Sequence, residues 1–212
     1  MNRTDIINTF INKYDYQSYL EIGLGSGLNY TWVKSFDKIG VDPSDEYQYT
    51  TYRITSDEFF ETIQPTLNKK YDIIFIDGLH TADQSYKDVI NAVRYLNSGG
   101  VMIMHDCNPP TEGHQKVPQS QTDWNGDVWK AFYKLRLLEW NDCERFWNLF
   151  TIDTDWGCGV IHNISLDLMP KYPHGNFPII QYEELTYDFF DKHRKEILNL
   201  ISIDEFKMYG HE

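Results

Sequence analysis

Cysteine and basic residues are scarce in this chain, and each shortage narrows the classes of protein to which it can belong. The three cysteines are odd in number and form no C-x-x-C pair, so we expect reduced thiols in a cytoplasmic protein rather than a disulfide framework. The 212 residues include 19 Lys and Arg against 32 Asp and Glu, which gives a formal net charge of −13. Nucleic-acid binders usually carry a basic stripe and none is present here, so we expect no nucleic-acid partner.

Long hydrophobic runs are absent as well. No stretch approaches 18 apolar residues, so we expect no membrane-spanning segment, and the first residues lack the apolar run of a signal peptide. A hydrophobic content of 41% and an aromatic content of 16% are instead typical of a globular protein. The length suits one domain, 1–212, with an expected core over about 15–163 and a C-terminal helical appendage over about 164–212.

The chemistry that is present centres on a glycine turn, in the stretch Y-L-E-I-G-L-G-S-G at residues 19–27. It follows a short apolar strand and has the pattern E-x-G-x-G-x-G. Glycine tolerates positive φ and has no Cβ, so the backbone can turn sharply and let a ligand lie against it. Asp42 follows about 20 residues later, at the end of a second predicted strand, where nucleotide-binding α/β folds have a ribose-binding acid. A plain glycine turn is the alternative, and this acid argues against it.

Strands and helices alternate along most of the chain. We predict helices over 4–14, 28–36, 81–96 and 187–200. A further helix is expected to start at Ser56, and another to follow the segment 124–129 and end at about Glu139. We predict strands over 18–23, 38–42, 49–55, 71–77, 101–106, 146–152 and 157–162, the third being the weakest. The helix 81–96 is expected to end in Asn97–Gly100, because glycine often terminates helices. The alternation predicts an α/β fold with a doubly wound, mostly parallel sheet.

The carboxyl ends of parallel strands meet at one edge of such a sheet, and ligands bind at that edge. Polar residues follow several of the predicted strands there: the turn 21–27, Asp42, Asp77, His80, His105 and Asp106. The polar loop Cys107–Asn125 comes next and is long for a simple connection, so we expect it to be functional or mobile.

Several separated motifs resemble class I S-adenosylmethionine (SAM)-dependent methyltransferases. The glycine stretch is similar to their motif I, whereas a dinucleotide fingerprint would need glycine where Leu28 stands. I-D-G-L-H at 76–80 and H-D at 105–106 resemble a small bacterial branch of the family, as do the segments 55–60, 105–110 and 124–130. The resemblance covers about two-thirds of the chain. Members of this branch often accompany polysaccharide- or glycan-modifying enzymes, which makes a sugar acceptor an expectation.

The resemblance implies a seven-stranded, Rossmann-like sheet whose last strand lies antiparallel beside the strand 101–106. It also implies a SAM site, with Asp42 on the ribose hydroxyls, Ser56 and Asp57 near the adenine, and Asp77 facing the sulfonium and the acceptor. The methionine end of that site would be shaped by Glu21, Gly23, Gly25 and Gly27.

Methyl transfer to a hydroxyl requires removal of the acceptor's proton as well as a bound donor. Displacement at an activated sulfonium mainly needs alignment of donor and acceptor. A general base can take the proton, and His80 is our candidate because an unperturbed histidine has a pKa of about 6.5. The alternative is a divalent metal held by Asp77, His105 and Asp106. Magnesium prefers oxygen ligands, however, and a histidine takes one of these places.

Two functions of other classes remain open. A NAD-type oxidoreductase would use the same kind of sheet, and the glycine spacing argues against it. A catalytically silent SAM-binding protein is the other, and the presence of Asp77, His80 and Asp106 together argues mildly against that. The leading hypothesis is an O-methyltransferase that acts on a small molecule or sugar, with N-methylation and a homo-oligomeric state left open. The weaker candidate site residues are His114, His162, Trp124 and Trp129.

Overall fold

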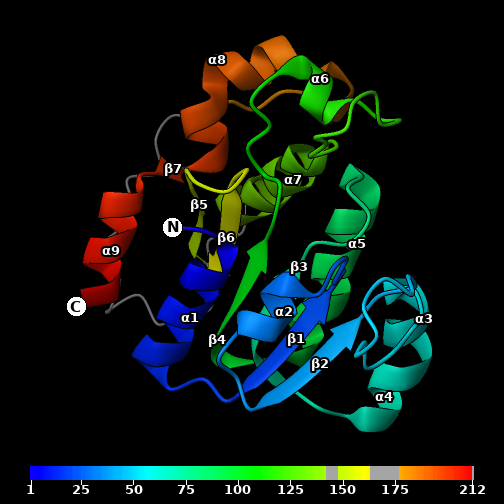
Figure 1. Cartoon of the computed structure of the whole chain (residues 1–212). Helices are drawn as coiled ribbons and strands as arrows, with labels where there is room; N and C mark the ends of the chain where they lie inside the picture. The colour runs from blue at the N-terminus through cyan, green and yellow to red at the C-terminus, as the bar shows by residue number, and fades with distance from the viewer. Residues whose placement is uncertain (142–147, 163–176, 212) are drawn as a thin grey trace.

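Seven strands form one sheet in the computed structural model, which describes residues 1–141, 148–162 and 177–211 (Figure 1). In chain order the strands are β1 (Ser18–Ile22), β2 (Asp37–Val41), β3 (Tyr71–Ile76), β4 (Leu96–Met104), β5 (Asn148–Ile152), β6 (Cys158–His162) and β7 (Leu200–Ile201). Across the sheet they follow the order β2-β1-β3-β4-β6-β5-β7. All neighbours are parallel except where β6 pairs with β4 and β5. The predicted fold class, including the antiparallel strand beside 101–106, is confirmed.

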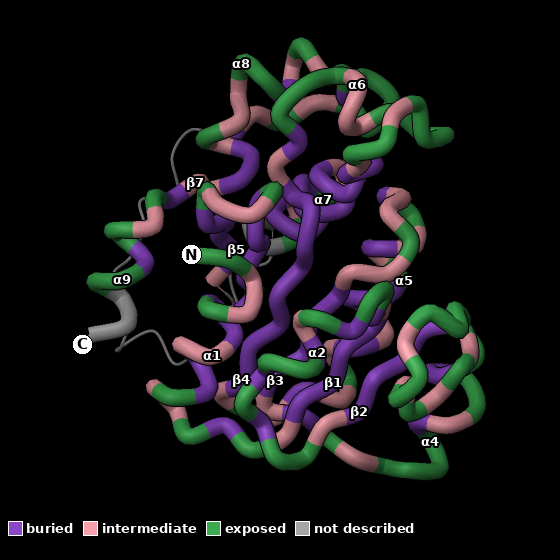
Figure 2. Tube along the Cα trace, in the orientation of Figure 1, coloured by how far each residue is buried: buried purple, intermediate pink, exposed green. Residues whose placement is uncertain are grey.

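Helices cover both faces of the sheet and enclose two hydrophobic cores (Figures 1 and 2). One core, which includes Phe10 and Phe206, lies under α1 (Arg3–Tyr14), α2 (Leu28–Trp32) and α9 (Ile203–His211). The other, which includes Trp129 and Phe190, lies under α5 (Ala82–Ala92), α7 (Val128–Asn141) and α8 (Tyr187–Leu198). Because the central strands are buried on both faces, only their ends are available for function.

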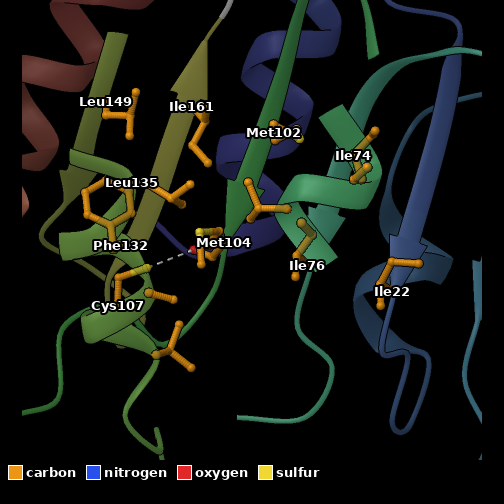
Figure 3. Packing of buried hydrophobic residues seen from close by; sticks show 14 of the residues in the cluster. Ile22, Ile74, Ile76, Met102, Met104, Cys107, Phe132, Leu135, Leu149 and Ile161 are labelled. Carbon is orange, nitrogen blue, oxygen red and sulfur yellow. Dashed lines mark hydrogen bonds between the residues drawn. The ribbon is translucent and has the colours of Figure 1, made fainter. Parts of the chain in front are cut away.

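Alternate residues of β3 pack into the two different cores. Ile74 and Ile76 belong to the core under α5 and α7, and Ile73 and Phe75 to the core under α1, because successive strand residues point to opposite faces. Figure 3 shows the core under α5 and α7, in which Ile76 lies close to Met104 of the neighbouring strand. Each such buried side chain stabilises the fold by about 1.5–3 kcal/mol relative to an exposed one. These cores fix the strand ends that carry the polar residues.

The seventh strand comes from a part of the chain where the sequence pattern predicted none. The predicted strand 49–55 is a loop with a single parallel bridge between Val41 and Tyr52, so that prediction is wrong. Tyr49 and Arg53 are exposed, and the alternate residues Tyr52 and Ile54 are only half-buried against the core, so no fully buried face fixes a ladder. At the opposite edge of the sheet, β7 pairs in parallel with β5 and completes the seven strands.

The segment Asn97–Gly100 lies within β4 and does not end a helix. α5 ends at Ala92 and is followed by a 3₁₀ turn, Val93–Tyr95. The register of β3 and β4 shifts between the pairs Tyr71–Leu96 and Ile73–Val101, so the two glycines are accommodated as an irregularity of the strand.

The helix predicted from Ser56 is present in three parts, α3 (Ser56–Glu58), a π-helical turn (Phe59–Ile63) and α4 (Gln64–Leu67). Its N-cap is Thr55 rather than Ser56, because the Thr55 hydroxyl accepts a hydrogen bond from the Glu58 backbone N–H. Ser56 is therefore left free of the capping role.

The described part of the C-terminal segment is built into the sheet and both helical layers. Phe190 of α8 packs against Trp129 of α7, and Phe206 of α9, a helix that the sequence pattern missed, packs against Phe10. Most of the predicted irregular stretch 165–178 lies outside the described residues, as does Cys143. Cys107 and Cys158 are buried free thiols. No helix in the described ranges is long and apolar enough to cross a membrane.

Candidate active site

The glycine turn after β1 owes its sequence to close packing. Gly23, Gly25 and Gly27 all have positive φ, at 84°, 47° and 72°. A Cβ on Gly23 would lie 2.1 Å from the carbonyl oxygen of Asp77, and one on Gly27 would lie 2.2 Å from the Tyr47 ring. A Cβ on Gly25 would have no neighbour within 4 Å. Packing therefore requires the first and last glycines, and the middle one faces open space.

Asp42 follows the end of β2 and organises this turn. Its Oδ2 accepts hydrogen bonds from the backbone N–H groups of Leu24, at 2.6 Å, and Gly25, at 3.0 Å. Its Oδ1 accepts one from Ser44 N–H at 2.7 Å. An ionised carboxylate has about four acceptor sites, so about one remains for a ligand. Asp42 thus holds the turn in place and also lines the space beside it.

A cavity of about 870 Å³ lies along this edge of the sheet. That volume falls within the range of about 300–1,000 Å³ that is typical of ligand sites. Nine of the predicted site residues contribute to its wall, and they lie after the carboxyl ends of strands or, for two of them, at the start of α3. They are Gly23, Gly25, Asp42, Ser56, Asp57, Asp77, His80, His105 and Asp106.

Ser56 and Asp57 stand at the start of α3, where the amide of Gln84 links them. Gln84 Nε2 donates to Ser56 Oγ at 3.2 Å, to Asp57 Oδ1 at 3.0 Å and to Asp88 Oδ1 at 3.0 Å. Lys87 Nζ lies 2.7 Å from Asp57 Oδ2, and its hydrogen bond lowers the pKa of that carboxyl. This end of the cavity is a prearranged polar wall.

Glu21 and Gly27 are not among the residues that line the cavity. The Glu21 carboxylate is buried beneath the turn, where it accepts hydrogen bonds from Tyr19 Oη at 2.5 Å and Asn29 Nδ2 at 3.2 Å. Burial raises the pKa of Glu21 to about 8. Any effect of these two residues on a ligand therefore acts through the shape of the turn.

The structure brings the four residues after β3 and β4 into one cluster. Asp77 Oδ1 lies 3.2 Å from both His80 Nε2 and His105 Nδ1. Asp106 Oδ2 lies 3.1 Å from His80 Nδ1 and 3.2 Å from His105 Nδ1. Each imidazole therefore sits between two carboxylates at the floor of the cavity.

The end of the loop 107–125 closes over this cluster. Asp106 has a φ of 62°, and its Oδ1 accepts a hydrogen bond from the buried Asn125 Nδ2 at 2.8 Å. A Cβ on Gly126 would lie 1.6 Å from the carbonyl oxygen of His80, so only glycine fits there. The loop also contains the short helix α6 (Glu112–Gln115). The W-N-G motif at 124–126 thus fixes the loop against the cluster.

Two residues that the sequence pattern did not single out complete the cluster. Arg3, the first residue of α1, donates from Nη1 to Asp77 Oδ2 at 2.7 Å, and from Nε to Asp155 Oδ2 at 2.9 Å. Asp155, in the turn between β5 and β6, also lies 3.7 Å from His105 Nε2. The spacing of the sequence contains no signal that joins residue 3 to residues 77 and 155, since only the tertiary fold brings them together.

Charges in this cluster are paired. Burial opposes ionisation of Asp77, yet His105, His80 and Arg3 outweigh it and hold the pKa of Asp77 below its usual range. Burial likewise disfavours the imidazolium of His80, but the hydrogen bond to Asp77 and the charge of Asp106 outweigh this and raise its pKa. Burial disfavours the imidazolium of His105 too, but the carboxylates of Asp77 and Asp106 outweigh this and raise its pKa well above the usual range. His80 is consequently protonated more readily than the unperturbed histidine assumed from the sequence.

The weaker candidates differ in their positions. Trp124 lines the cavity and stacks on His80 with ring centroids 5.5 Å apart, and Trp156 lines it too, with the His114 ring 5.4 Å away. Trp129 is fully buried in a core and His162 lies at the other end of the sheet, so neither belongs to the site.

Asp77, His80 and Asp106 offer one group of possible metal ligands within 4.8 Å of one another, and His105, Asp155 and Cys158 offer a second. Both groups mix imidazole with carboxylate, which suits borderline transition metals better than magnesium. Arg3 already provides a cation beside Asp77 Oδ2, at 2.7 Å. A metal on Asp77 would therefore have to bind on the opposite oxygen.

Comparison with known proteins gives a family for part of the chain and a fold for most of it. Residues 20–107 match the model of a family described as a methyltransferase domain. None of the curated proteins compared with the chain matches it.

Solved structures resemble it at low sequence identity. An O-methyltransferase from Bacillus cereus in complex with S-adenosylhomocysteine (SAH) has a TM-score of 0.55 and 15% identity, over 76% of this chain and 82% of that one. A SAH-bound methyltransferase from Podospora anserina has a TM-score of 0.53 and 16% identity, over 77% and 78%. An O-methyltransferase of tomaymycin synthesis from Streptomyces achromogenes, in complex with SAM, has a TM-score of 0.51 and 13% identity, over 76% of this chain and 78% of that one. Their shared feature is the Rossmann-like fold.

Proposed function

We propose that this chain transfers the methyl group of SAM to a hydroxyl of a small molecule or glycan, because residues 20–107 match the model of a methyltransferase domain and the fold is that of SAH-bound methyltransferases. The observation that carries the proposal is a single cavity that joins the glycine turn and Asp42 to the cluster of Asp77, His80 and Asp106. A donor site and a proton-handling site thus share one space.

In this proposal SAM lies along the strand ends. The ribose hydroxyls bond to Asp42, the methionine part lies over Gly23 and Gly25, and the adenine lies near Ser56 and Asp57. The open space at Gly25 and the remaining acceptor site of Asp42 support these roles. The SAM and SAH complexes among proteins of the same fold are consistent with them.

The reaction breaks the bond between the methyl carbon and the sulfonium sulfur and forms a bond to the acceptor oxygen, whose proton must leave. His80 is the proposed base, with Asp77 beside it. Its raised pKa favours the protonated imidazole, which must lose that proton before it can accept the acceptor's, so turnover should rise with pH over a range above the one usual for histidine. A divalent metal on Asp77, His105 and Asp106 would instead lower the pKa of the acceptor hydroxyl.

Aromatic side chains support a ring-shaped acceptor. Trp124, which stacks on His80, and Trp156 both line the cavity, as does Leu79, which is 59% exposed. Flat apolar walls next to carboxylates suit a sugar or phenol, whose ring face packs on tryptophan while its hydroxyls bond to the acids.

Isothermal titration with SAM, SAH and NAD tests the cofactor. We expect the wild type to bind SAM and SAH and not NAD, and to bind the 2′-deoxy analogue of SAH about tenfold more weakly because a hydrogen bond is lost. Asp42→Ala should weaken SAH by about tenfold or more and should no longer discriminate against the deoxy analogue. Asp45→Ala, at an exposed neighbouring acid, is the control. If the Asp42 variant still discriminates, that residue acts only on the turn.

Release of SAH in the presence of a panel of sugars, phenols and amines tests the acceptor. Turnover of hydroxyl acceptors supports the proposal, and turnover of amines alone would replace it with N-methylation. Full SAM affinity with no turnover across the panel would favour a silent SAM-binding protein.

A further inference from the structure

Arg3 is the one lysine or arginine that lines the cavity within the described part of the chain. Its guanidinium makes three side-chain hydrogen bonds, to Asp77 Oδ2 at 2.7 Å, Asp155 Oδ2 at 2.9 Å and Asp155 Oδ1 at 3.1 Å. The Arg3 backbone N–H also donates to Asp155 Oδ2 at 2.7 Å. α1 and the turn between β5 and β6 are thus joined at the floor of the site.

The position of this cation matters because the donor of the proposed reaction is itself a cation. SAM carries a positive sulfonium, whereas the product SAH is neutral at sulfur. Asp77 and Asp155 would attract the sulfonium, and Arg3, within hydrogen-bond distance of both, offsets that attraction. Tight binding of the positive ground state would slow transfer, because the positive charge on sulfur is lost as the methyl group leaves.

We propose that Arg3 is a specificity-determining residue, which sets the relative affinity of the site for cationic SAM and neutral SAH by limiting the net negative charge around Asp77. This inference rests on the proposed function. Asp155 has the opposite effect on this relative affinity, since it adds negative charge to the cluster around Asp77. It also holds Arg3 in position through its hydrogen bonds.

The structure suggests two variants with effects of opposite sign. Arg3→Met removes the cation and should increase the ratio of the SAH to the SAM dissociation constant by about tenfold, while Asp155→Asn should lower that ratio. Arg3→Lys keeps the charge and should leave the ratio within about twofold of wild type, even if it weakens the bidentate bond. Arg94→Met is the matched control, because Arg94 is exposed and lies in the turn that follows α5, away from the cavity.

Isothermal titration of SAM and SAH at low and high salt measures the ratio without an acceptor, and thermal denaturation checks that each variant folds. Damage to the architecture alone would weaken both ligands together and leave the ratio unchanged. An unchanged ratio in Arg3→Met, or shifts of the same sign in Arg3→Met and Asp155→Asn, would overturn the inference. Failure of the wild type to bind either ligand would instead refute the proposed function.

Discussion

Replacing the buried Glu21 by glutamine should change how the stability of the protein depends on pH. Glu21 is 1% exposed, and burial raises its pKa from 4.5 to about 8 in the folded protein. Between these two values the folded state holds a proton that the unfolded state releases. The contribution of Glu21 to the folding stability is therefore complete below about pH 4.5. It is lost as the pH rises toward 8, by about 1.36 kcal/mol per pH unit.

The magnitude follows from this linkage. Between pH 5.5 and pH 8.5 the wild type should lose about 3 kcal/mol through Glu21, a large part of the about 5–15 kcal/mol that stabilises a typical domain. Glu21→Gln has nearly the same shape and no titration, so it can keep its bonds to Tyr19 and Asn29. Relative to the wild type, the variant should gain about 3 kcal/mol over this interval, or about 6–12 °C in midpoint temperature.

Urea or thermal denaturation of both proteins across this pH range measures the effect. Other groups titrate in the same window, but they are common to the two proteins and cancel in the difference. Glu61→Gln, at an exposed carboxyl, controls for the loss of a charge. Parallel stability curves for the wild type and Glu21→Gln would mean that the Glu21 carboxyl is ionised in the folded protein, and the account of its burial would be wrong.

Three further predictions concern the turn, the base and the loop. Gly23→Ala should destabilise the fold by more than about 2 kcal/mol, because its Cβ would overlap Asp77 O, and an unchanged midpoint in urea would contradict this. His80→Ala should lower turnover by about 10²–10⁴ if His80 is the base, and turnover should then survive a strong chelator, whereas loss with the chelator and recovery with a divalent ion would identify a metal. The loop 107–125 should be cut more slowly by proteases when SAM and an acceptor are bound, and equal rates would count against a lid.

Local patterns in the sequence were sufficient for the fold class and for the edge at which the site lies. The apolar run 73–76 predicts a strand buried on both faces, because its successive residues, which point to opposite faces, are all apolar. The glycine turn could be placed because positive φ and close backbone approach are demands on single residues, such as Gly23. Asp77, His80, His105 and Asp106 could be grouped in advance because parallel strands must end at a common edge.

Tertiary structure alone decided the rest, since it depends on contacts between residues far apart in the chain. The seventh strand is β7 rather than 49–55, because strand pairing depends on which segment the fold places against an open edge of the sheet. That segment is β7, beside β5, whereas 49–55 makes a single bridge to Val41. Arg3 meets Asp77 and Asp155 across 74 and 152 residues, a distance over which no local pattern extends. The protonation of the site could not be predicted either: a histidine has a pKa of about 6.5 on its own, and it is the carboxylates of Asp77 and Asp106 and the Trp124 backbone, which the fold brings to His80, that raise it.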